Sequence, residues 1–589
     1  MQKASLKEFR SLIPYLSRYR WRYVLGFLCL IIVDVAQIFI PQCIRQAVDL
    51  ISSGRFNWHS VLVICGVLLG IALVISLGRF LWRFFIHGSS RRIETELRDK
   101  LFSHLLTLSY DFYQKNKIGD LMARGTNDIN AVRMSIGMGL VALIDGTVMA
   151  SAILVIMFMQ DARTAALAII PLPLITILIL FFGSAVGKRF RRAQETYSSM
   201  SDTVQETFAG IRVIKSFVKE WWFIKKFADT NDDYKDANMA LVKIFGVFFP
   251  LISFLSGLTT LILLLVGGQR VVEGLMSPGE LVALFSYLQM LIWPMLGAGF
   301  MVNMIQRGAT SLMRVNEILN TKPSITSPDD PVKAPAAGTV SPAIELRDLT
   351  FAYPGGGPVL RDISLAIPRG AMVGILGKTG SGKSTMLKAL VRLVDPPEGT
   401  VFAEGVDVRL WDLKELRGRF GMTPQDSYLF SDSIKNNISY GAARAGEEQI
   451  HKAAELSSID RDLESFSVGW DTLIGERGLT LSGGQKQRVA ISRALVRDPE
   501  FLVLDDSLSA VDAETERRIL NMLLANRRGK TTLIVSHRVS TLHNADQVIV
   551  LDQGRVSEYG TPQELISRGG FYSQMAELQQ LEQAGEGDR

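Results

Sequence analysis

The stretch Gly377-Lys378-Thr379-Gly380-Ser381-Gly382-Lys383-Ser384 decides how the second half of this chain folds. The apolar run 371–376 precedes it and predicts a β-strand, and a helical pattern begins at Lys383. Glycines between a strand and a helix let backbone N–H groups curl around phosphate, and the helix N-terminus adds a favourable dipole. We therefore expect a phosphate-binding loop, in which Lys383 would bridge the β- and γ-phosphates of a nucleotide and Ser384 would hold Mg²⁺.

Two further motifs follow this loop. The segment Leu481-Ser482-Gly483-Gly484-Gln485 comes first, and an apolar strand that ends in Asp505 comes after it. A carboxylate at that strand end is a hard ligand suited to hold Mg²⁺ through water. The three motifs in this order resemble the ATP-binding cassette (ABC) family. The resemblance implies that the chain binds ATP and Mg²⁺, and that its LSGGQ segment closes over the γ-phosphate of ATP held by the other cassette of a dimer.

Further positions match the family at the expected order and spacing. The resemblance implies that Tyr353 stacks on adenine, that Gln425 touches Mg²⁺ and senses the membrane domain, and that His537 contacts the γ-phosphate. Asp512 resembles the loop that crosses the dimer interface, and residues 472–478 resemble a segment that exporter-type cassettes place before LSGGQ. The residues expected to contact ATP are Tyr353, Gly377, Lys378, Thr379, Gly380, Ser381, Gly382, Lys383, Ser384, Thr385, Ser482, Gly483, Gly484 and Gln485. Those expected at Mg²⁺ are Ser384, Gln425 and Asp505, and those expected to act in hydrolysis are Asp506, His537 and Gln425.

Asp506 departs from the family pattern, because the residue after the strand aspartate is usually a glutamate that polarises the attacking water. Aspartate is one methylene shorter, and a water-positioning group displaced by ~1 Å can cost on the order of 10²-fold in rate. ATP binding needs only the phosphate loop, Mg²⁺ and the LSGGQ segment, so we expect it to survive. We predict slow hydrolysis at this chain's own site. The alternative is that Asp506 works adequately and the chain is an ordinary homodimer.

The first half of the chain contains six apolar stretches of about 20 residues, the length that a bilayer core requires. They are residues 22–42, 61–80, 138–159, 164–186, 244–267 and 281–304. Short loops alternate with two long ones, which carry Arg91, Arg92, Arg98, Lys100, Arg124, Lys188, Arg189, Arg191, Arg192 and Lys225. The positive-inside rule places the long loops and both termini in the cytoplasm, and we expect the loops to continue the membrane helices. The first apolar run is long enough to span a bilayer, so we expect no cleaved leader.

The composition agrees with a membrane protein joined to a soluble domain. The net charge is +6 and the mean hydropathy is +0.21. Much of the excess Lys and Arg lies beside the apolar stretches, so we do not expect nucleic-acid binding. Three cysteines, Cys29, Cys43 and Cys65, show no metal-ligand spacing and predict no disulfide framework. Asp34 and Asp145 fall inside apolar stretches, where an acid usually faces a cavity or a partner.

The predicted organisation is an all-α membrane domain of six transmembrane helices with long cytoplasmic extensions, fused to an α/β nucleotide-binding domain. We place the membrane domain at 1–320, a proline-rich linker at 321–342, the cassette at 343–578 and a flexible tail at 579–589. Apolar runs at 371–376, 501–504, 532–535 and 547–551 alternate with helical stretches, which predicts a largely parallel sheet.

Over essentially its whole length the chain resembles half-size ABC exporters, including the patterns at 112–128 and 206–215. We expect ATP-driven export of small, amphipathic molecules across the cytoplasmic membrane by a multidrug-type heterodimer, in which this chain supplies the degenerate ATP site. The expected partners are a second half-transporter, membrane lipid and a small-molecule substrate. The alternatives are a homodimeric lipid or peptide exporter, a regulatory ATP-binding subunit, and an importer energy module, which the fused membrane domain disfavours.

Overall fold

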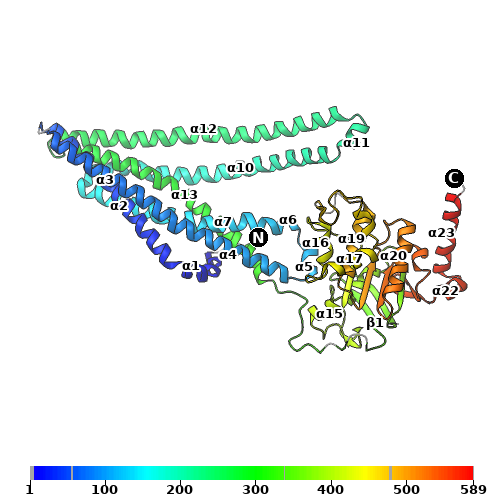
Figure 1. Ribbon diagram of the computed structural model, residues 1–589. Helices are drawn as coiled ribbons and strands as arrows, with labels where there is room; N and C mark the ends of the chain where they lie inside the picture. Colours follow the sequence, from blue (N-terminus) through cyan, green and yellow to red (C-terminus); the bar gives the residue numbers. More distant parts are fainter. Residues whose placement is uncertain (1–5, 55–56, 334, 337–338, 476–480, 588–589) are drawn as a thin grey trace. The chain divides into compact units, whose positions relative to one another are not determined.

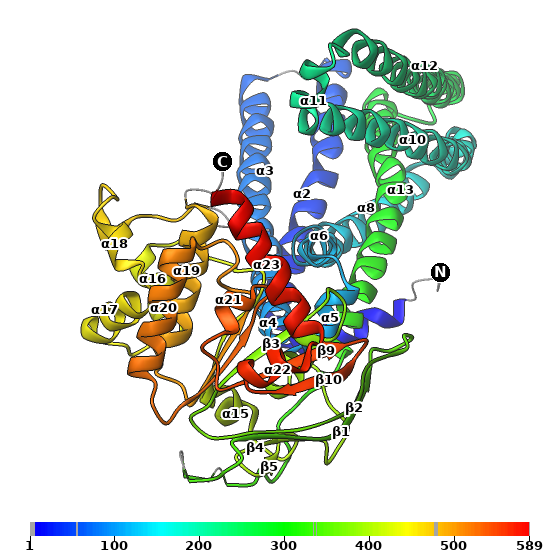
Figure 2. The same cartoon turned by 90° about the vertical axis from the view of Figure 1, so that its right-hand side faces the viewer.

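The computed structural model describes residues 6–54, 57–333, 335–336, 339–475 and 481–587, which form two compact units (Figures 1 and 2). Unit 1 comprises Met1–Thr107 and Asn116–Thr321, and unit 2 comprises Leu108–Lys115 and Lys322–Arg589. The segment Leu108–Lys115 therefore leaves unit 1 and belongs to the second unit. Each unit has its own hydrophobic core.

Unit 1 is helical throughout its described residues. Its helices are α1 (Ile13–Arg18), α2 (Arg20–Ser52), α3 (Trp58–Trp82), α4 (Gly88–Thr107), α6 (Ile118–Ala123), α7 (Ile129–Met134), α8 (Leu140–Gln160), α9 (Ala162–Ile169), α10 (Pro171–Ala209), α11 (Ile211–Ser216), α12 (Glu220–Val272) and α13 (Pro278–Asn320). A π-helical turn joins α3 to α4. Two more join α6 to α7 and α7 to α8, so that each of these series of helices continues without a break. α10 and α12 lie side by side, and the short α11 connects them (Figures 1 and 2).

Four helical stretches among the described residues are long and apolar enough to cross a membrane: Arg20–Ser52, Trp58–Thr107, Ile118–Gln160 and Glu220–Val272. Two shorter apolar stretches, Ala162–Ile175 and Pro278–Ile292, lie in the regions of the fourth and sixth predicted spans. The prediction that the long loops continue the membrane helices is confirmed, because α3–α4 spans 50 residues and α12 spans 53. The total of six spans stays a prediction.

The two aspartates of the apolar stretches lie against each other. Asp34 of α2 is fully buried, and its neighbour is the carboxyl group of Asp145 on α8. The nearby Arg79 of α3 donates instead to Gln37, over 3.2 Å. The partner that Asp34 faces is thus another acid, on a different helix.

The end of α2 is fastened to the start of α13. One carboxylate oxygen of Asp49 accepts the Gly279 N–H over 2.8 Å, and the other accepts the Ser277 hydroxyl over 3.0 Å. Arg45 adds an ion pair to Glu280 over 2.7 Å. A Cβ atom at Gly279 would lie 2.3 Å from the Arg45 carbonyl oxygen, so this approach has no room for a side chain.

Unit 2 contains two β-sheets. The smaller sheet has the order β2-β1-β4-β5, formed by β1 (Ile344–Ala352), β2 (Pro358–Ile367), β4 (Val401–Ala403) and β5 (Val406–Asp407). The larger has the order β10-β9-β3-β8-β7-β6, formed by β3 (Met372–Gly377), β6 (Phe420–Thr423), β7 (Phe501–Asp505), β8 (Thr531–Val535), β9 (Gln547–Asp552) and β10 (Arg555–Gly560). All neighbours in the larger sheet are parallel except β9 and β10. The predicted parallel sheet is confirmed, with strand ends shifted by a residue or so.

Both faces of the larger sheet are buried, which explains its continuous apolar strands. Val373 and Ile375 of β3 face the core shared with the smaller sheet, and Met372 and Leu376 face the core on the helical side. The helices of unit 2 are α5 (Tyr110–Lys115), α14 (Lys383–Leu390), α15 (Leu413–Arg419), α16 (Ile434–Ser439), α17 (Glu447–Leu456), α18 (Asp460–Leu463), α19 (Gly483–Leu495), α20 (Ala513–Asn526), α21 (Val539–Leu542), α22 (Pro562–Arg568) and α23 (Phe571–Gly587). α23 extends beyond residue 578, where the sequence analysis ends the cassette.

The segment Leu108–Lys115, which contains the short helix α5, is attached to the rest of unit 2 by a cation–π contact and by hydrogen bonds. The Lys388 ammonium of α14 lies over the Tyr110 ring, 5.5 Å from its centroid. The Ser324 hydroxyl donates to Asp111 over 2.8 Å, and the Ile325 N–H donates to Ser109 over 2.9 Å. Much of the proline-rich segment also packs on this unit, because Ser327 pairs with Asp412 and Val332 donates to Leu410.

The close approach at Gly279 generates a stability prediction. Gly279→Ala should lower the melting temperature of the purified transporter by several degrees, because an overpacked methyl group costs about 1–3 kcal/mol. The matched control is Gly66→Ala on α3, where an added Cβ meets nothing within 4 Å. Thermal unfolding of both variants in detergent is the measurement. Equal melting temperatures for the two variants would contradict this account of the α2–α13 contact.

Candidate functional site

Four neighbouring strands of the larger sheet bring the predicted residues to one edge. The phosphate loop follows β3, Asp506 follows β7, His537 follows β8 and Gln425 follows β6. The carboxyl ends of parallel neighbours meet at the same edge of a sheet, where ligands bind in open α/β folds. A pocket of about 190 Å³ lies there. It is lined by Val359, Thr379, Gly380, Ser381, Gly382, Lys383, Ser384, Thr385, Gln425, Asp505, Asp506, Val535 and His537.

Two glycines allow the loop to turn back against the sheets. Gly382 has φ +100°, and a Cβ there would lie 2.7 Å from the Leu360 side chain. A Cβ at Gly377 would lie 2.4 Å from the carbonyl oxygen of Leu551. The turn therefore requires glycine at both positions, and it places the first N–H groups of α14 at the pocket.

Lys383, the first residue of α14, is folded into the loop. Its side chain is buried, and the ammonium donates to the carbonyl oxygens of Gly377 over 2.7 Å and Lys378 over 3.0 Å. Burial lowers the pKa of Lys383, and the carboxylates of Asp505 and Asp506 oppose that shift. A cation held at the N-terminus of a helix concentrates positive charge where the loop would receive phosphate.

Asp505 ends β7 with 4% of its surface exposed. Burial raises the pKa of Asp505, while a hydrogen bond from Ser384 lowers it and the charge of Asp506 raises it. The phosphate loop also contains a polar group that fits a bound ligand: the buried Ser381 hydroxyl has no hydrogen-bond partner among the described residues. The hydroxyl of Ser384 and the carboxylate of Asp505 form an all-oxygen donor set, which suits Mg²⁺ bound together with a nucleotide's phosphates.

The backbone of Asp506 is left-handed, with φ +50°. Its N–H donates to the Val535 carbonyl oxygen over 3.1 Å, so β8 holds the residue in place. Among residues other than glycine, aspartate and asparagine are favoured in this conformation. The side chain lines the pocket and is half-buried.

Two other predicted residues lie at the rim. Gln425 and His537 are both exposed and both line the pocket. Tyr353 is absent from the lining, but its hydroxyl lies 3.3 Å from the Thr385 hydroxyl, and its ring packs edge-on against Phe351. Lys378 completes the loop, with its ammonium 5.5 Å from the Phe571 ring centroid.

The LSGGQ segment is not part of this pocket's described lining. Ser482 caps α19: its hydroxyl accepts the Gln485 N–H over 3.3 Å, and the Gln485 side chain accepts the Ser482 N–H over 2.9 Å. This reciprocal capping box orders the first turn of the helix. A Cβ at Gly484 would lie 2.9 Å from the Ala510 carbonyl oxygen. Of the exporter-type segment 472–478, residues 476–478 lie outside the described residues.

Sequence reasoning missed several residues that hold the site together. The Gln487 side chain accepts the Ala510 N–H over 2.9 Å and donates to the Ser509 hydroxyl over 3.1 Å, which ties α19 to the segment after Asp506. Asp462 accepts Gln485 over 3.1 Å and Arg488 over 2.6 Å. The only sequence signal for Gln487 was its place beside LSGGQ. Asp512, which the sequence places in the loop expected to cross the dimer interface, caps α20 by accepting the Thr515 N–H, and this hydrogen bond lowers the pKa of its carboxyl group.

Comparisons with known proteins agree with this geometry. Residues 23–295 match the family described as ABC transporter transmembrane region, and residues 360–509 match the family described as ABC transporter. The chain is 39% identical to the probable multidrug resistance ABC transporter ATP-binding/permease protein YheI of Bacillus subtilis, over 97% of this chain and 98% of that protein.

Two other relatives match over nearly their whole length. The multidrug resistance-like ATP-binding protein MdlA of Escherichia coli is 35% identical, over 98% of each chain. The ATP-dependent lipid A-core flippase of Syntrophus aciditrophicus is 31% identical, over 97% of this chain and 94% of that protein.

A solved structure of a bacterial Atm1-family ABC exporter with ATP bound superposes with a TM-score of 0.78 at 25% identity, covering 95% of this chain and 98% of that one. The chain belongs to the ABC transporters and is a half-size ABC exporter, with one transmembrane region and one ATP-hydrolysing cassette.

Proposed function

We propose that this chain is one half of a heterodimeric exporter that moves small amphipathic molecules out across the cytoplasmic membrane, and that its own ATP site hydrolyses slowly. The observation that carries the proposal is Asp506, where the family pattern has glutamate. The multidrug names of the B. subtilis and E. coli relatives support the substrate class.

ATP would bind with its phosphates in the turn between β3 and α14. The backbone N–H groups of residues 378–382 and the Lys383 ammonium would meet the β- and γ-phosphates, and Thr385 would lie close by. Tyr353 would stack on adenine from its place beside Thr385. Ser384, Asp505 and Gln425 would hold Mg²⁺, which neutralises phosphate charge when bound.

Hydrolysis needs a carboxylate that orients the attacking water. Asp506 is held by β8 through its N–H, so the short side chain cannot advance unless the backbone moves. Its reach therefore ends about one methylene short of the glutamate position, which lowers the rate. His537 on the neighbouring strand end would still contact the γ-phosphate, so ATP would be bound but turned over slowly.

The LSGGQ segment would serve the other site of the dimer. Ser482 and the two glycines begin α19, where free N–H groups and the helix dipole attract an anion. A partner's ATP would receive these donors, and the partner's own carboxylate would perform most of the hydrolysis. Closure of the cassettes on ATP would turn the membrane domain outward, and hydrolysis would reset it.

The proposed topology has six spans with both termini in the cytoplasm. The attachment of α5 to unit 2 supports it, because Leu108–Lys115 must then lie on the side of the cassette, where ATP is found. The buried Asp34–Asp145 pair supports a polar site inside the membrane domain, because buried carboxyl groups in apolar spans are costly unless the protein uses them.

One specific comparison favours a second candidate. The name of the lipid A-core flippase at 31% identity supports a lipid substrate. In a homodimer of this chain that exports lipid, Asp506 would be an adequate catalytic carboxylate. In that case the chain purified alone would hydrolyse ATP at full speed.

The topology is tested by cysteine labelling in a variant without Cys29, Cys43 and Cys65. A cysteine at Asn57 should react with a membrane-impermeant maleimide added to intact cells, and a cysteine at Lys115 should react only after permeabilisation. A permeant maleimide, as control, should label both. Reaction of both sites from the same side would rule out the proposed arrangement.

The asymmetry of the two ATP sites is tested by steady-state ATPase of the assembled transporter. Gly484→Asp should lower turnover on the order of 10²-fold, because a carboxylate would face the γ-phosphate in the partner's site. Gly484→Ala is the matched control, since it introduces the same Cβ beside Ala510 without a charge and should lower turnover less. Asp506→Asn should change turnover only slightly.

Two outcomes of this comparison would contradict the proposal. The first is an Asp506→Asn variant as inactive as Gly484→Asp. The second is equal loss in Gly484→Asp and Gly484→Ala, which would assign the effect to the contact with Ala510 rather than to the γ-phosphate of the partner's site.

A further inference from the structure

The C-terminal helix α23 is fixed to the cassette at its first turn. Tyr572 is completely buried in the core on the helical side of the larger sheet. The Glu558 carboxylate of β10 accepts the N–H groups of Phe571 and Tyr572. A carboxylate at a helix N-terminus satisfies free donors and stabilises the helix through its dipole. The direction of α23 is therefore set by the cassette.

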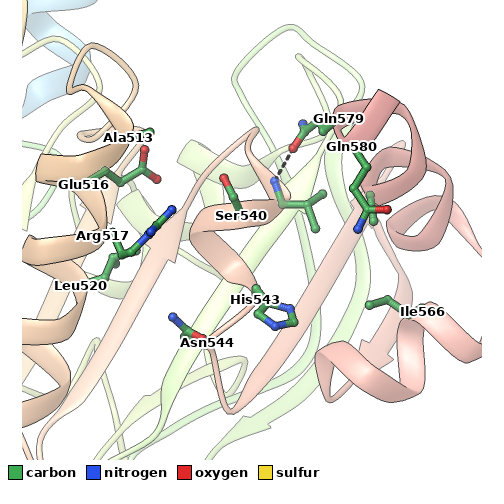
Figure 3. A pocket seen from close by; sticks show the side chains of 12 residues that line it. Ala513, Glu516, Arg517, Leu520, Ser540, His543, Asn544, Ile566, Gln579 and Gln580 are labelled. Carbon is green, nitrogen blue, oxygen red and sulfur yellow. Dashed lines mark hydrogen bonds between the residues drawn. The ribbon is translucent and has the colours of Figure 1, made fainter. Parts of the chain in front are cut away.

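α23 reaches the nucleotide site at two points. Near its start, the Phe571 ring lies under the ammonium of Lys378 in the phosphate loop. Two turns later, the Gln579 side chain makes two hydrogen bonds with the segment that follows β8. Its amide N–H donates to the His537 carbonyl oxygen over 2.8 Å, and its carbonyl oxygen accepts the Val539 N–H over 2.8 Å (Figure 3 draws the second of these).

These two bonds hold the backbone on both sides of Arg538, and the Arg538 side chain ties the same segment to α20 and to the loop before α20. The Arg538 guanidinium donates to the buried Glu516 carboxylate over 2.7 Å and to the carbonyl oxygens of Val511 over 3.2 Å and Ser509 over 3.0 Å. His537 is therefore exposed at the pocket, while the backbone around it is held both by Gln579 of α23 and by the side-chain contacts of Arg538. Without the Gln579 hydrogen bond, the His537 carbonyl group would no longer be held, and the orientation of the imidazole ring would no longer be fixed.

A second pocket lies beside Gln579, and its lining contains a residue that can serve as a control. It has a volume of about 420 Å³ and lies among α20, α21, α22 and α23 (Figure 3). Gln579 and Gln580 both line it, but only Gln579 bonds to the segment after β8. Gln580 is the same residue type on the same helix, one position further along.

We propose that Gln579 is a positioning residue for His537, and that through it α23 sets the preference of this site for ATP over ADP. The inference rests on the proposed contact between His537 and the γ-phosphate, which ADP lacks. An amide that fixes the His537 backbone would hold the imidazole where that phosphate arrives. The α- and β-phosphates, held by the loop after β3, would be unaffected.

The test uses the full-length transporter purified through a tag on this chain. Photolabelling by azido-ATP and by azido-ADP is measured on ice, and the label recovered on this chain gives an affinity for each nucleotide. Gln579→Ala should lower the preference for azido-ATP about fivefold, the factor of one ordinary hydrogen bond, and leave azido-ADP affinity unchanged. Gln580→Ala should equal wild type.

The His537→Ala background separates positioning from a general structural effect. There the preference should already be reduced, and adding Gln579→Ala should change it no further. An unchanged preference in Gln579→Ala overturns the inference, as does equal loss of azido-ADP affinity or an undiminished effect of Gln579→Ala without His537. An unchanged preference in His537→Ala alone would instead remove the proposed γ-phosphate contact. None of these readings depends on the hydrolysis rate at Asp506.

Discussion

The nucleotide pocket depends on a turn that has no space for side chains. Between β3 and α14 the chain passes against Leu551 of β9 and Leu360 of β2, at distances that only glycine allows at positions 377 and 382. That turn aims the N-terminus of α14 at the pocket and sets Lys383 and Ser384 beside the ends of β7 and β8. The buried Asp505 faces them, and the charges of lysine and aspartate moderate the cost of each other's burial.

The proposed asymmetry follows from a residue held by the same sheet. Asp506 is in a left-handed conformation and its N–H is bonded to β8, so its side chain starts from a fixed point. Shortening a side chain from a fixed backbone displaces the carboxylate without disturbing the phosphate loop. In the proposed function, one methylene would separate binding from hydrolysis, and the site would contribute to cassette closure more than to turnover.

Much of this arrangement could be predicted from the sequence, because local rules govern it. The turn needs glycines, a buried strand is apolar throughout, and parallel strands end at one edge, so β3, β7 and β8 and their terminal residues were found. Contacts between distant segments have no such signal. Gln579 lies in a polar stretch that predicts a flexible tail, yet its side chain bonds to the backbone of His537 and Val539. Likewise, no pattern indicates that Asp34 would meet another acid or that Leu108–Lys115 would belong to the second unit.

The most direct measurement of the central claim is the location of trapped nucleotide after hydrolysis. The assembled transporter is turned over with azido-ATP and orthovanadate, irradiated, and separated into its two chains. The account predicts vanadate-dependent labelling of the partner, and labelling of this chain that does not rise with vanadate, because its site retains ATP without rapid cleavage. Vanadate-dependent labelling of this chain equal to the partner's would contradict it and establish Asp506 as a competent catalytic carboxylate.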